Sequence, residues 1–297
     1  MAADSHSISP WDGGATGRAT GWPLLLLRRF YVQAYLDFMF MTRDIRFFCI
    51  CAISDVVGSL SRVMAVFLLA ERFDGIGVWS REQILFMLGY ATLVNGLLDM
   101  FFGYNILGIS RRLGRGQLDH SLVQPQPLWM TLLTEGFTPV IGFFPVAAGV
   151  AIVGWVMSGP AGIHADVVWW ITFGVELVAS CLIVVSFSFL WGTLAFWSPV
   201  GAEEISSRVN RMARQLTVFP LDSLSPWLTQ VALLALPLGF VVWYPSRALL
   251  GLAGASPWHA PLFAIVLFLV TTLVFSWGLR HYERTGSQRY LLFGHRR

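Results

Sequence analysis

Five ionisable side chains fall within long apolar runs of this sequence: Asp55, Arg62, Asp99, Glu135 and Glu176. A charge at the centre of a lipid bilayer costs at least about 2.5 kcal/mol unless it is paired or hydrated. Groups of this kind therefore contact a substrate, relay protons or pair with one another between helices. Glu135 and Glu176 lie near the ends of their runs, and for them above all we expect structural pairing. The spacing leaves substrate contact and proton relay open for Asp55, Arg62, Asp99 and Glu135.

Other chemistry is excluded by residue type. All twenty basic residues are arginine, so the chain has no lysine for a phosphate-binding P-loop or a Schiff base. If ATP is used, another chain must bind it together with its magnesium ion. Cys49, Cys51 and Cys181 lie in apolar runs without metal-ligand spacing, and no acid pair or Ser/His/Asp set has a recognisable catalytic spacing. We therefore expect no catalytic residues, no metal site and no cofactor bound by this chain.

The polar stretch 111–127 (RRLGRGQLDHSLVQPQP) interrupts this apolar pattern. Gly114 and Gly116 allow the chain to turn sharply. A short helix from about Asp119 would place Leu118 and Leu122 on one side, since residues four apart are neighbours on a helix surface. The stretch also contains Arg111, Arg112 and Arg115 and ends at Pro125 and Pro127. It is either an ordinary arginine-rich turn or a rigid element that a partner contacts.

The elements that hold these residues are predicted to be membrane helices. The chain of 297 residues is 56% hydrophobic and 12% charged, which is far below the roughly 25% charged residues of soluble domains. A span needs about 20 apolar residues. Hydropathy therefore predicts an all-α integral membrane protein with six spans, at about 47–69, 84–107, 128–157, 167–197, 228–250 and 260–280. Pro139 and Pro145 predict kinks in the third span, and prolines make the fifth the least regular.

Residues outside the spans complete the predicted organisation. Residues 24–46 are predicted to form an amphipathic helix in the membrane interface, with Arg29, Gln33, Asp37 and Asp44 on a polar stripe that faces water. A second amphipathic helix is expected at 198–219, on the inner leaflet or on a partner. Residues 1–22 and 287–297 are expected to be cytoplasmic tails on either side of a membrane domain at 23–286, the first of them disordered.

Arginine is concentrated on one predicted side of the membrane. The segments before the first span, between spans two and three, between spans four and five, and after span six are rich in it, whereas the other three loops contain only Arg72, Arg81 and Arg247. Positively charged short loops stay in the cytoplasm. Both termini are therefore predicted to be cytoplasmic.

Two parts of the sequence resemble the ABC type 2 exporter permeases of bacteria. The loop of that family reads as basic residues, then G-x-L-D, two residues, a leucine and a proline-bounded exit. The corresponding positions here are Arg115, Gly116, Leu118, Asp119, Leu122, Pro125, Pro127 and Leu128. The stretch 219–245 resembles a second landmark of the same family through Pro220, Pro226, Trp227, Leu228, Pro237 and Pro245. The resemblance runs from about residue 30 to residue 286 and departs from the family at Gln124, where an arginine is common.

The resemblance implies a non-enzymatic permease of the bacterial inner membrane with six spans. It also implies a dimeric cytosolic ABC ATPase as partner, a second permease that is identical or related, and no contact with nucleic acid. The loop would be the coupling helix that rests on the ATPase, with Arg111, Arg112, Arg115, Gly116, Leu118, Asp119, Leu122 and Pro125 at the contact. The predicted path walls are apolar and aromatic, which favours a lipid-like or amphipathic cargo.

Two other functions remain open from the residues themselves. A proton-coupled secondary transporter would use Asp55, Asp99 or Glu135 as proton carriers and would need no ATPase. A membrane enzyme acting on lipids would need a catalytic cluster near an interface, and the sequence shows none.

Overall fold

The structure is a computed structural model that describes residues 22–72, 79–114, 116–124, 128–159, 165–216, 220–223, 225, 227, 229–230, 233, 237–252 and 254–286. The predicted tails at 1–22 and 287–297 lie outside these residues, apart from Trp22, as do Arg115 and Pro125. Regular structure in the described residues is helical, which agrees with the predicted fold class. The α-helices are α1 (Trp22–Arg43), α2 (Ile45–Arg72), α3 (Arg81–Gly114), α4 (Gln117–Val123), α5 (Leu128–Thr134), α6 (Pro139–Ser158), α7 (Val167–Gly192), α8 (Pro199–Leu216), α10 (Trp243–Leu249) and α11 (His259–Thr285). Short 3-10 helices are η1 (Thr193–Phe196), η2 (Leu221–Ser223) and η3 (Leu238–Phe240).

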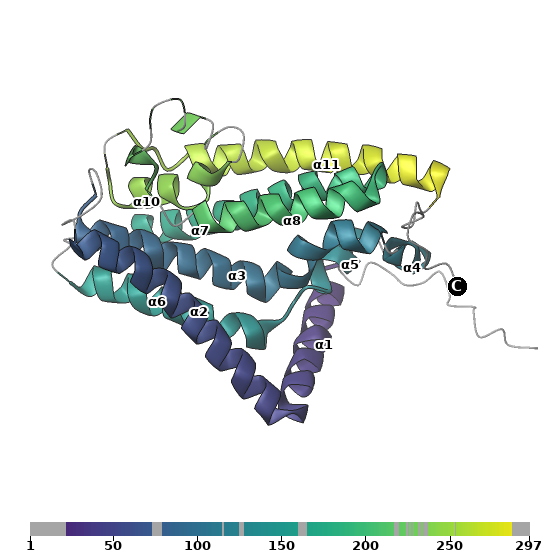
Figure 1. Cartoon of the computed structure of the whole chain (residues 1–297), viewed down its shortest axis with the longest axis horizontal. Coiled ribbons are helices and arrows are strands. Elements are labelled where there is room, and N and C mark those ends of the chain that lie inside the picture. The colour runs from purple at the N-terminus through teal and green to yellow at the C-terminus, as the bar shows by residue number, and fades with distance from the viewer. Residues whose placement is uncertain are drawn as a thin grey trace, which may run out of the picture.

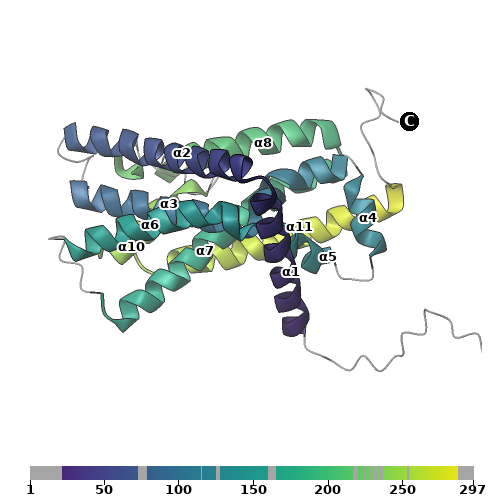
Figure 2. The same cartoon turned by 90° about the horizontal axis from the view of Figure 1, so that it is seen from below.

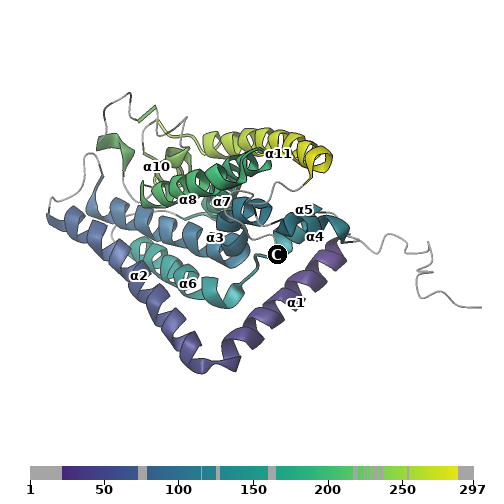
Figure 3. The same ribbon diagram turned by 45° about the vertical axis from the view of Figure 1, so that its right-hand side comes forward.

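The helix α3 is the centre of the bundle (Figure 1). Its side chains from Ile84 to Leu98 are largely buried, and α6 packs along it. Glycines permit this close approach: a Cβ on Gly149 would lie 2.6 Å from the Leu93 nitrogen, and one on Gly142 would lie 2.4 Å from the Met100 Cβ. The axes of α7, α8 and α11 lie roughly along that of α3, whereas α1 and α2 form a V that opens toward the bundle (Figures 1 and 3).

Among the described residues, four helices contain segments that are long and apolar enough to cross a membrane: Ile45–Ala65, Arg81–Gly103, Val167–Phe196 and His259–Thr285. They correspond to the first, second, fourth and sixth predicted spans. A shorter apolar helix covers Gly142–Ser158. The total of six spans stays a prediction.

The third predicted span, 128–157, is not one helix. It is divided into α5 and α6, with residues 135–138 between them. Pro139 is the first residue of α6, and a proline disfavours helical geometry in the residue before it. Thr138 accordingly has φ −129° and ψ 72°, and its backbone N–H donates to the Met100 oxygen at 2.7 Å. The predicted kink at Pro139 is therefore a complete break, whereas Pro145 lies inside α6.

The fifth predicted span, 228–250, is partly outside the described residues, and its described part does not form a helix along the bundle. The Trp79 indole, two residues before α3, donates to Asp222 Oδ2 at 2.5 Å, and the Trp169 indole at the start of α7 donates to the Leu249 oxygen at 2.9 Å. Residues on both sides of 228–237 therefore lie at the end of the bundle where α3 and α7 begin.

The helix α8 takes the chain to that end. Ala202, near its start, belongs to the same buried cluster as Ile109 at the far end of α3, while Asp222 follows its last residue by only six positions. In Figures 1 and 2, α8 runs alongside the other long helices rather than across them. The helix expected at 198–219 is therefore present over Pro199–Leu216. Its position on the inner leaflet or on a partner stays a prediction.

The helix α1 covers most of residues 24–46, and Arg29, Gln33 and Asp37 of the predicted polar stripe are only partly exposed. Asp37 accepts a hydrogen bond from the Val140 backbone N–H at 3.0 Å and thereby caps the start of α6. Leu27, Tyr31 and Phe40, by contrast, are exposed. The expectation that the stripe faces water was therefore wrong for Asp37, because the start of α6 offers its side chain a backbone donor. The interfacial position of α1 stays a prediction.

Candidate functional site

The short helix predicted in the loop at 111–127 is present as α4. It begins two residues earlier than expected, at Gln117, because Gly116 makes the turn with φ 68°, a left-handed conformation that suits glycine. The Gly116 N–H donates to the Leu113 oxygen at 3.0 Å, which closes the end of α3. The turn and the seven-residue helix place α4 beyond the end of α3 in Figure 1.

The two leucines of α4 have different environments. Leu118 is only 2% exposed, whereas Leu122 is 37% exposed and the adjacent Val123 is 85% exposed. Leu118 belongs to a buried apolar cluster, here called the end cluster, that consists of Ile109, Leu113, Leu118, Leu132, Ala195, Phe196, Ala202 and Tyr282. Leu118 therefore holds α4 on the bundle, and Leu122 and Val123 are the apolar side chains that a partner could reach.

A hydrogen bond joins α4 to the last membrane helix. The Tyr282 hydroxyl donates to the Asp119 Oδ1 at 2.6 Å. The Tyr282 ring packs edge-on against Phe196 with centroids 5.7 Å apart, so its position is fixed by the end cluster. Gly278, one turn earlier on α11, lets Phe196 approach, because a Cβ there would lie 2.4 Å from the Phe196 ring.

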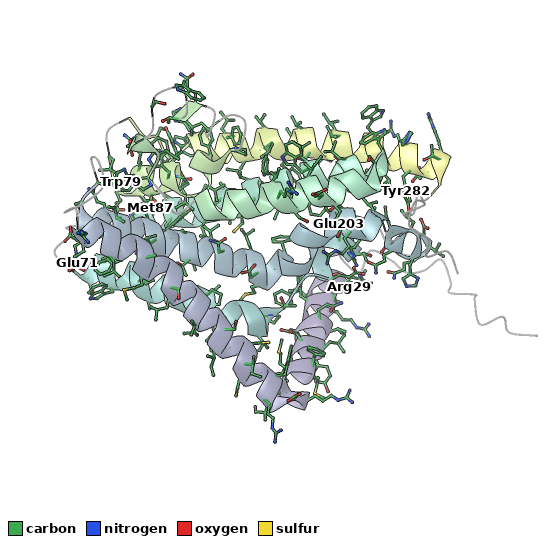
Figure 4. All side chains as sticks on the ribbon, in the orientation of Figure 1. Arg29, Glu71, Trp79, Met87, Glu203 and Tyr282 are labelled. Atoms are coloured by element: carbon green, nitrogen blue, oxygen red, sulfur yellow. The ribbon has the colours of Figure 1, made fainter. Side chains whose placement is uncertain are left out.

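Two loop arginines connect helices rather than project freely. Arg111 Nε donates to Glu203 Oε1 at 2.8 Å, which joins the end of α3 to the start of α8. Arg112 forms an ion pair with Glu135, at the break between α5 and α6. The side chains of this second pair are largely buried: Arg112 is 14% exposed and Glu135 is 27% exposed. These contacts and the Tyr282–Asp119 hydrogen bond tie α4 and the end of α3 to three different parts of the bundle (Figure 4 labels Glu203 and Tyr282).

Among the described residues, the acids predicted to lie within the membrane have different surroundings. The backbones of Asp55 and Arg62 lie in α2, but their side chains are outside the described set. Asp99 is partly buried in α3, where its backbone oxygen accepts from the Thr138 hydroxyl at 3.0 Å. Glu135 has the structural pairing that its position suggested. Glu176 is fully buried, and neither carboxyl oxygen has a hydrogen-bond partner among the described residues.

Sequence reasoning missed two members of the site, Tyr282 and Glu203. Tyr282 lies four residues after Gly278, so the pair marks one face of α11, but nothing in the sequence names the partner of that face. Glu203 is an acid in an arginine-rich loop, which is a weak indication of an ion pair.

A comparison with protein families gives the class of the protein. Residues 56–286 match the model described as ABC-2 family transporter protein. The chain belongs to the ABC-2 transporter family. It is thus the membrane-embedded permease type of ABC transporter subunit, a multi-pass transport protein. The comparisons with curated proteins and with solved structures gave no significant match.

The residues at which the family match begins and ends show which parts of the site it includes. The match begins inside α2 and ends one residue after α11, so it contains α4 and every partner described for it. The helix α1 lies outside the match. The ABC-2 family therefore covers the loop that the sequence singled out, but not the helix that precedes the first span.

Proposed function

We propose that this ABC-2 permease works in an ATP-driven exporter and that α4 is the element by which a separate ATPase moves it. The single observation that carries this proposal is the construction of α4: a rigid helix beyond the end of α3, anchored inward by Leu118 and Asp119 and exposing Val123. An anchored helix with an exposed apolar tip can transmit a movement of the ATPase to the permease. A loop without these anchors would deform instead.

Three contacts would transmit a movement of α4 and the end of α3 to other helices of the bundle. Asp119 acts on α11 through Tyr282, Arg111 acts on α8 through Glu203, and Arg112 acts on the start of α6 through Glu135. Packed helix interfaces tend to switch between discrete arrangements rather than deform continuously. Closure of the ATPase would therefore shift α6, α8 and α11 together and open a path on one side of the membrane.

We assign the partners and orientation on the same grounds. The ATPase is a dimer that carries ATP and magnesium, and it acts on two permeases. The polar residues of α8 support this pairing: Glu204 and Arg208 are exposed on a helix that runs along the bundle. Charged side chains at membrane depth need water or protein against them. A second permease or an aqueous path would supply this. The arginine-rich end that holds α4 is placed in the bacterial cytoplasm, with both termini.

The proposed cargo is lipid-like or amphipathic. The exposed apolar side chains of α2 and α11 include Ile53, Leu60 and Leu273. Apolar walls bind by burial of apolar area rather than by directed hydrogen bonds. This is compatible with a substrate that has an acyl or aromatic portion.

One observation favours a second candidate function, the proton-coupled secondary transporter. The carboxyl of Glu176 is buried, and neither of its oxygens has a hydrogen-bond partner among the described residues. A buried intramembrane acid that is not held by a structural pair is a candidate proton carrier. Against it, Glu135, one of the acids that such a transporter was expected to use, is held by Arg112.

Transport in proteoliposomes separates the two functions. The permease and its ATPase are reconstituted with a fluorescent short-chain lipid, and transport is measured with ATP or with an imposed pH gradient. The exporter proposal predicts transport with ATP alone and no loss in Glu176→Gln, which keeps the shape of the side chain without an ionisable proton. Transport driven by the pH gradient, and abolished in Glu176→Gln, would overturn it.

A further inference from the structure

A cavity of about 500 Å³ lies where α1 meets the loop that contains α4. Its polar lining consists of Arg28, Arg29 and Gln33 from α1, Gln124 at the end of α4, and Thr134 and Glu135 at the end of α5. The volume falls in the range of roughly 300–1,000 Å³ that is typical of small-molecule sites. Figure 4 labels Arg29 on α1, near α5.

The charges of the cavity favour an anion. Arg28 and Arg29 line it, and among the described residues neither side chain has an ion pair or a hydrogen bond. The one lining carboxylate, Glu135, is already compensated by Arg112. Two arginines and two amide side chains provide the donors that a phosphate group requires, and arginine binds phosphate with paired hydrogen bonds.

The surroundings of the cavity indicate that this phosphate is attached to a lipid. Leu25 and Val32 also line the cavity, and both are largely exposed, at 47% and 45%. The outer side of α1 continues this apolar surface through Leu24, Leu27, Tyr31, Leu36 and Phe40. A phosphate site bordered by exposed apolar side chains on a helix of this kind is typical of contact with a bilayer surface. A soluble phosphate ion would not contact these apolar side chains.

We propose that this cavity binds the phosphate-bearing headgroup of an anionic phospholipid in the leaflet on which α1 lies. Arg28 and Arg29 hold the phosphate oxygens, Gln33 and Gln124 contact the polar remainder of the headgroup, and the acyl chains leave along Leu25 and Val32. The proposal concerns α1, which lies outside the matched family region, and it does not depend on the action of an ATPase.

The test measures lipid binding by the purified full-length chain in a neutral detergent. Dioctanoyl phosphatidylglycerol, dioctanoyl phosphatidylcholine and inorganic phosphate are titrated separately, and binding is followed by native mass spectrometry. The double variant Arg28→Gln/Arg29→Gln removes both guanidinium groups. The matched control is Arg43→Gln, which removes an arginine from the other end of the same helix, outside the cavity. A third variant, Gln33→Glu, adds a negative charge to the wall with almost no change in size.

The proposal predicts that the wild-type chain and Arg43→Gln bind phosphatidylglycerol equally and prefer it to phosphatidylcholine. Arg28→Gln/Arg29→Gln should weaken this binding by at least about tenfold, because a hydrogen bond to a charged group typically contributes that much or more. Gln33→Glu should weaken it as well. Equal binding of the two lipids, or unchanged affinity in both cavity variants, would overturn the proposal. Displacement of the lipid by inorganic phosphate at equal concentration would show a soluble-phosphate site and overturn the assignment to a lipid.

Discussion

The Tyr282 hydroxyl donates a 2.6 Å hydrogen bond to Asp119 Oδ1 and so joins α4 to the last turn of α11. The two residues are 163 positions apart in the chain. The contact is partly buried, and the aromatic ring of Tyr282 is held separately by the end cluster. The hydroxyl can therefore be removed without emptying the core around it.

Tyr282→Phe tests whether this hydrogen bond transmits movement. The ring and its packing on Phe196 are kept, so the protein should still insert and fold. Loss of a hydrogen bond to a charged group removes roughly 1.5–3 kcal/mol, with the lower end expected at a partly exposed site. We expect fewer substrate molecules moved per ATP hydrolysed, measured in proteoliposomes with the ATPase. Tyr35→Phe, at an exposed tyrosine of α1, is the control. An unchanged ratio in Tyr282→Phe would remove this contact from the coupling route.

Leu118→Ala and Leu122→Ala should differ in stability, although the sequence makes the positions look equivalent. Leu118 is buried, so its truncation should destabilise the protein by about 2–5 kcal/mol. Leu122 is exposed, so the same change should stay within about 0.5 kcal/mol. Thermal unfolding of the two variants in detergent measures the difference. Equal effects would contradict the inward anchoring of α4.

The Arg112–Glu135 ion pair should be restored by exchanging its charges. Glu135→Ala leaves a largely buried guanidinium with one partner fewer and should cost about 1–2 kcal/mol. Arg112→Glu should cost more, because it places two acids side by side. The double variant Arg112→Glu/Glu135→Arg should recover part of that loss in thermal stability. A double variant no more stable than Arg112→Glu would show that the pair does not connect the end of α3 to the break before α6.

Asp37 should make the docking of α1 depend on pH. Burial raises the pKa of its carboxyl above the ordinary value of 3.8, and the hydrogen bond from Val140 offsets only part of this rise. The folded protein therefore holds the proton more tightly than the unfolded chain. The resulting contribution to stability is complete below the unfolded pKa and is lost as the pH rises through the folded pKa.

Asp37→Asn removes this titration while keeping an oxygen that can accept from Val140. The melting temperature of the wild type relative to Asp37→Asn should therefore rise as the pH falls from 7 toward 4. A difference that is constant with pH, or that falls on acidification, would show that the Asp37 carboxyl is not buried against α6.

The sequence was sufficient where local rules decide the structure. Gly116 and the polar composition of 111–127 predicted the turn and the short helix α4, because left-handed backbone geometry favours glycine at one definite position. Four of the predicted spans correspond to helices with apolar segments of sufficient length, since a continuous apolar run is a local property. The family match supports the same class of protein.

The sequence was insufficient where distant residues decide the structure. Helical spacing places Leu118 and Leu122 on one side of α4, but it does not say that the end cluster covers only Leu118. Amphipathic spacing predicts the helix α8, but it does not say that Glu203, near the start of this helix, pairs with Arg111 at the end of α3. Asp37 was assigned to water because its acceptor role depends on the start of α6, 103 residues away.

Co-purification of the tagged chain from native membranes in mild detergent shows whether the exposed tip of α4 contacts an ATPase. Val123 is 85% exposed, so Val123→Asp should leave the fold intact while placing a charge in an apolar contact. Val123→Ile keeps the contact apolar and is the matched control. We expect the wild type and Val123→Ile to retain a Walker-motif ATPase, identified by mass, and Val123→Asp to lose it at unchanged yield of the permease. Full retention of the ATPase by Val123→Asp would mean that this tip is not the contact.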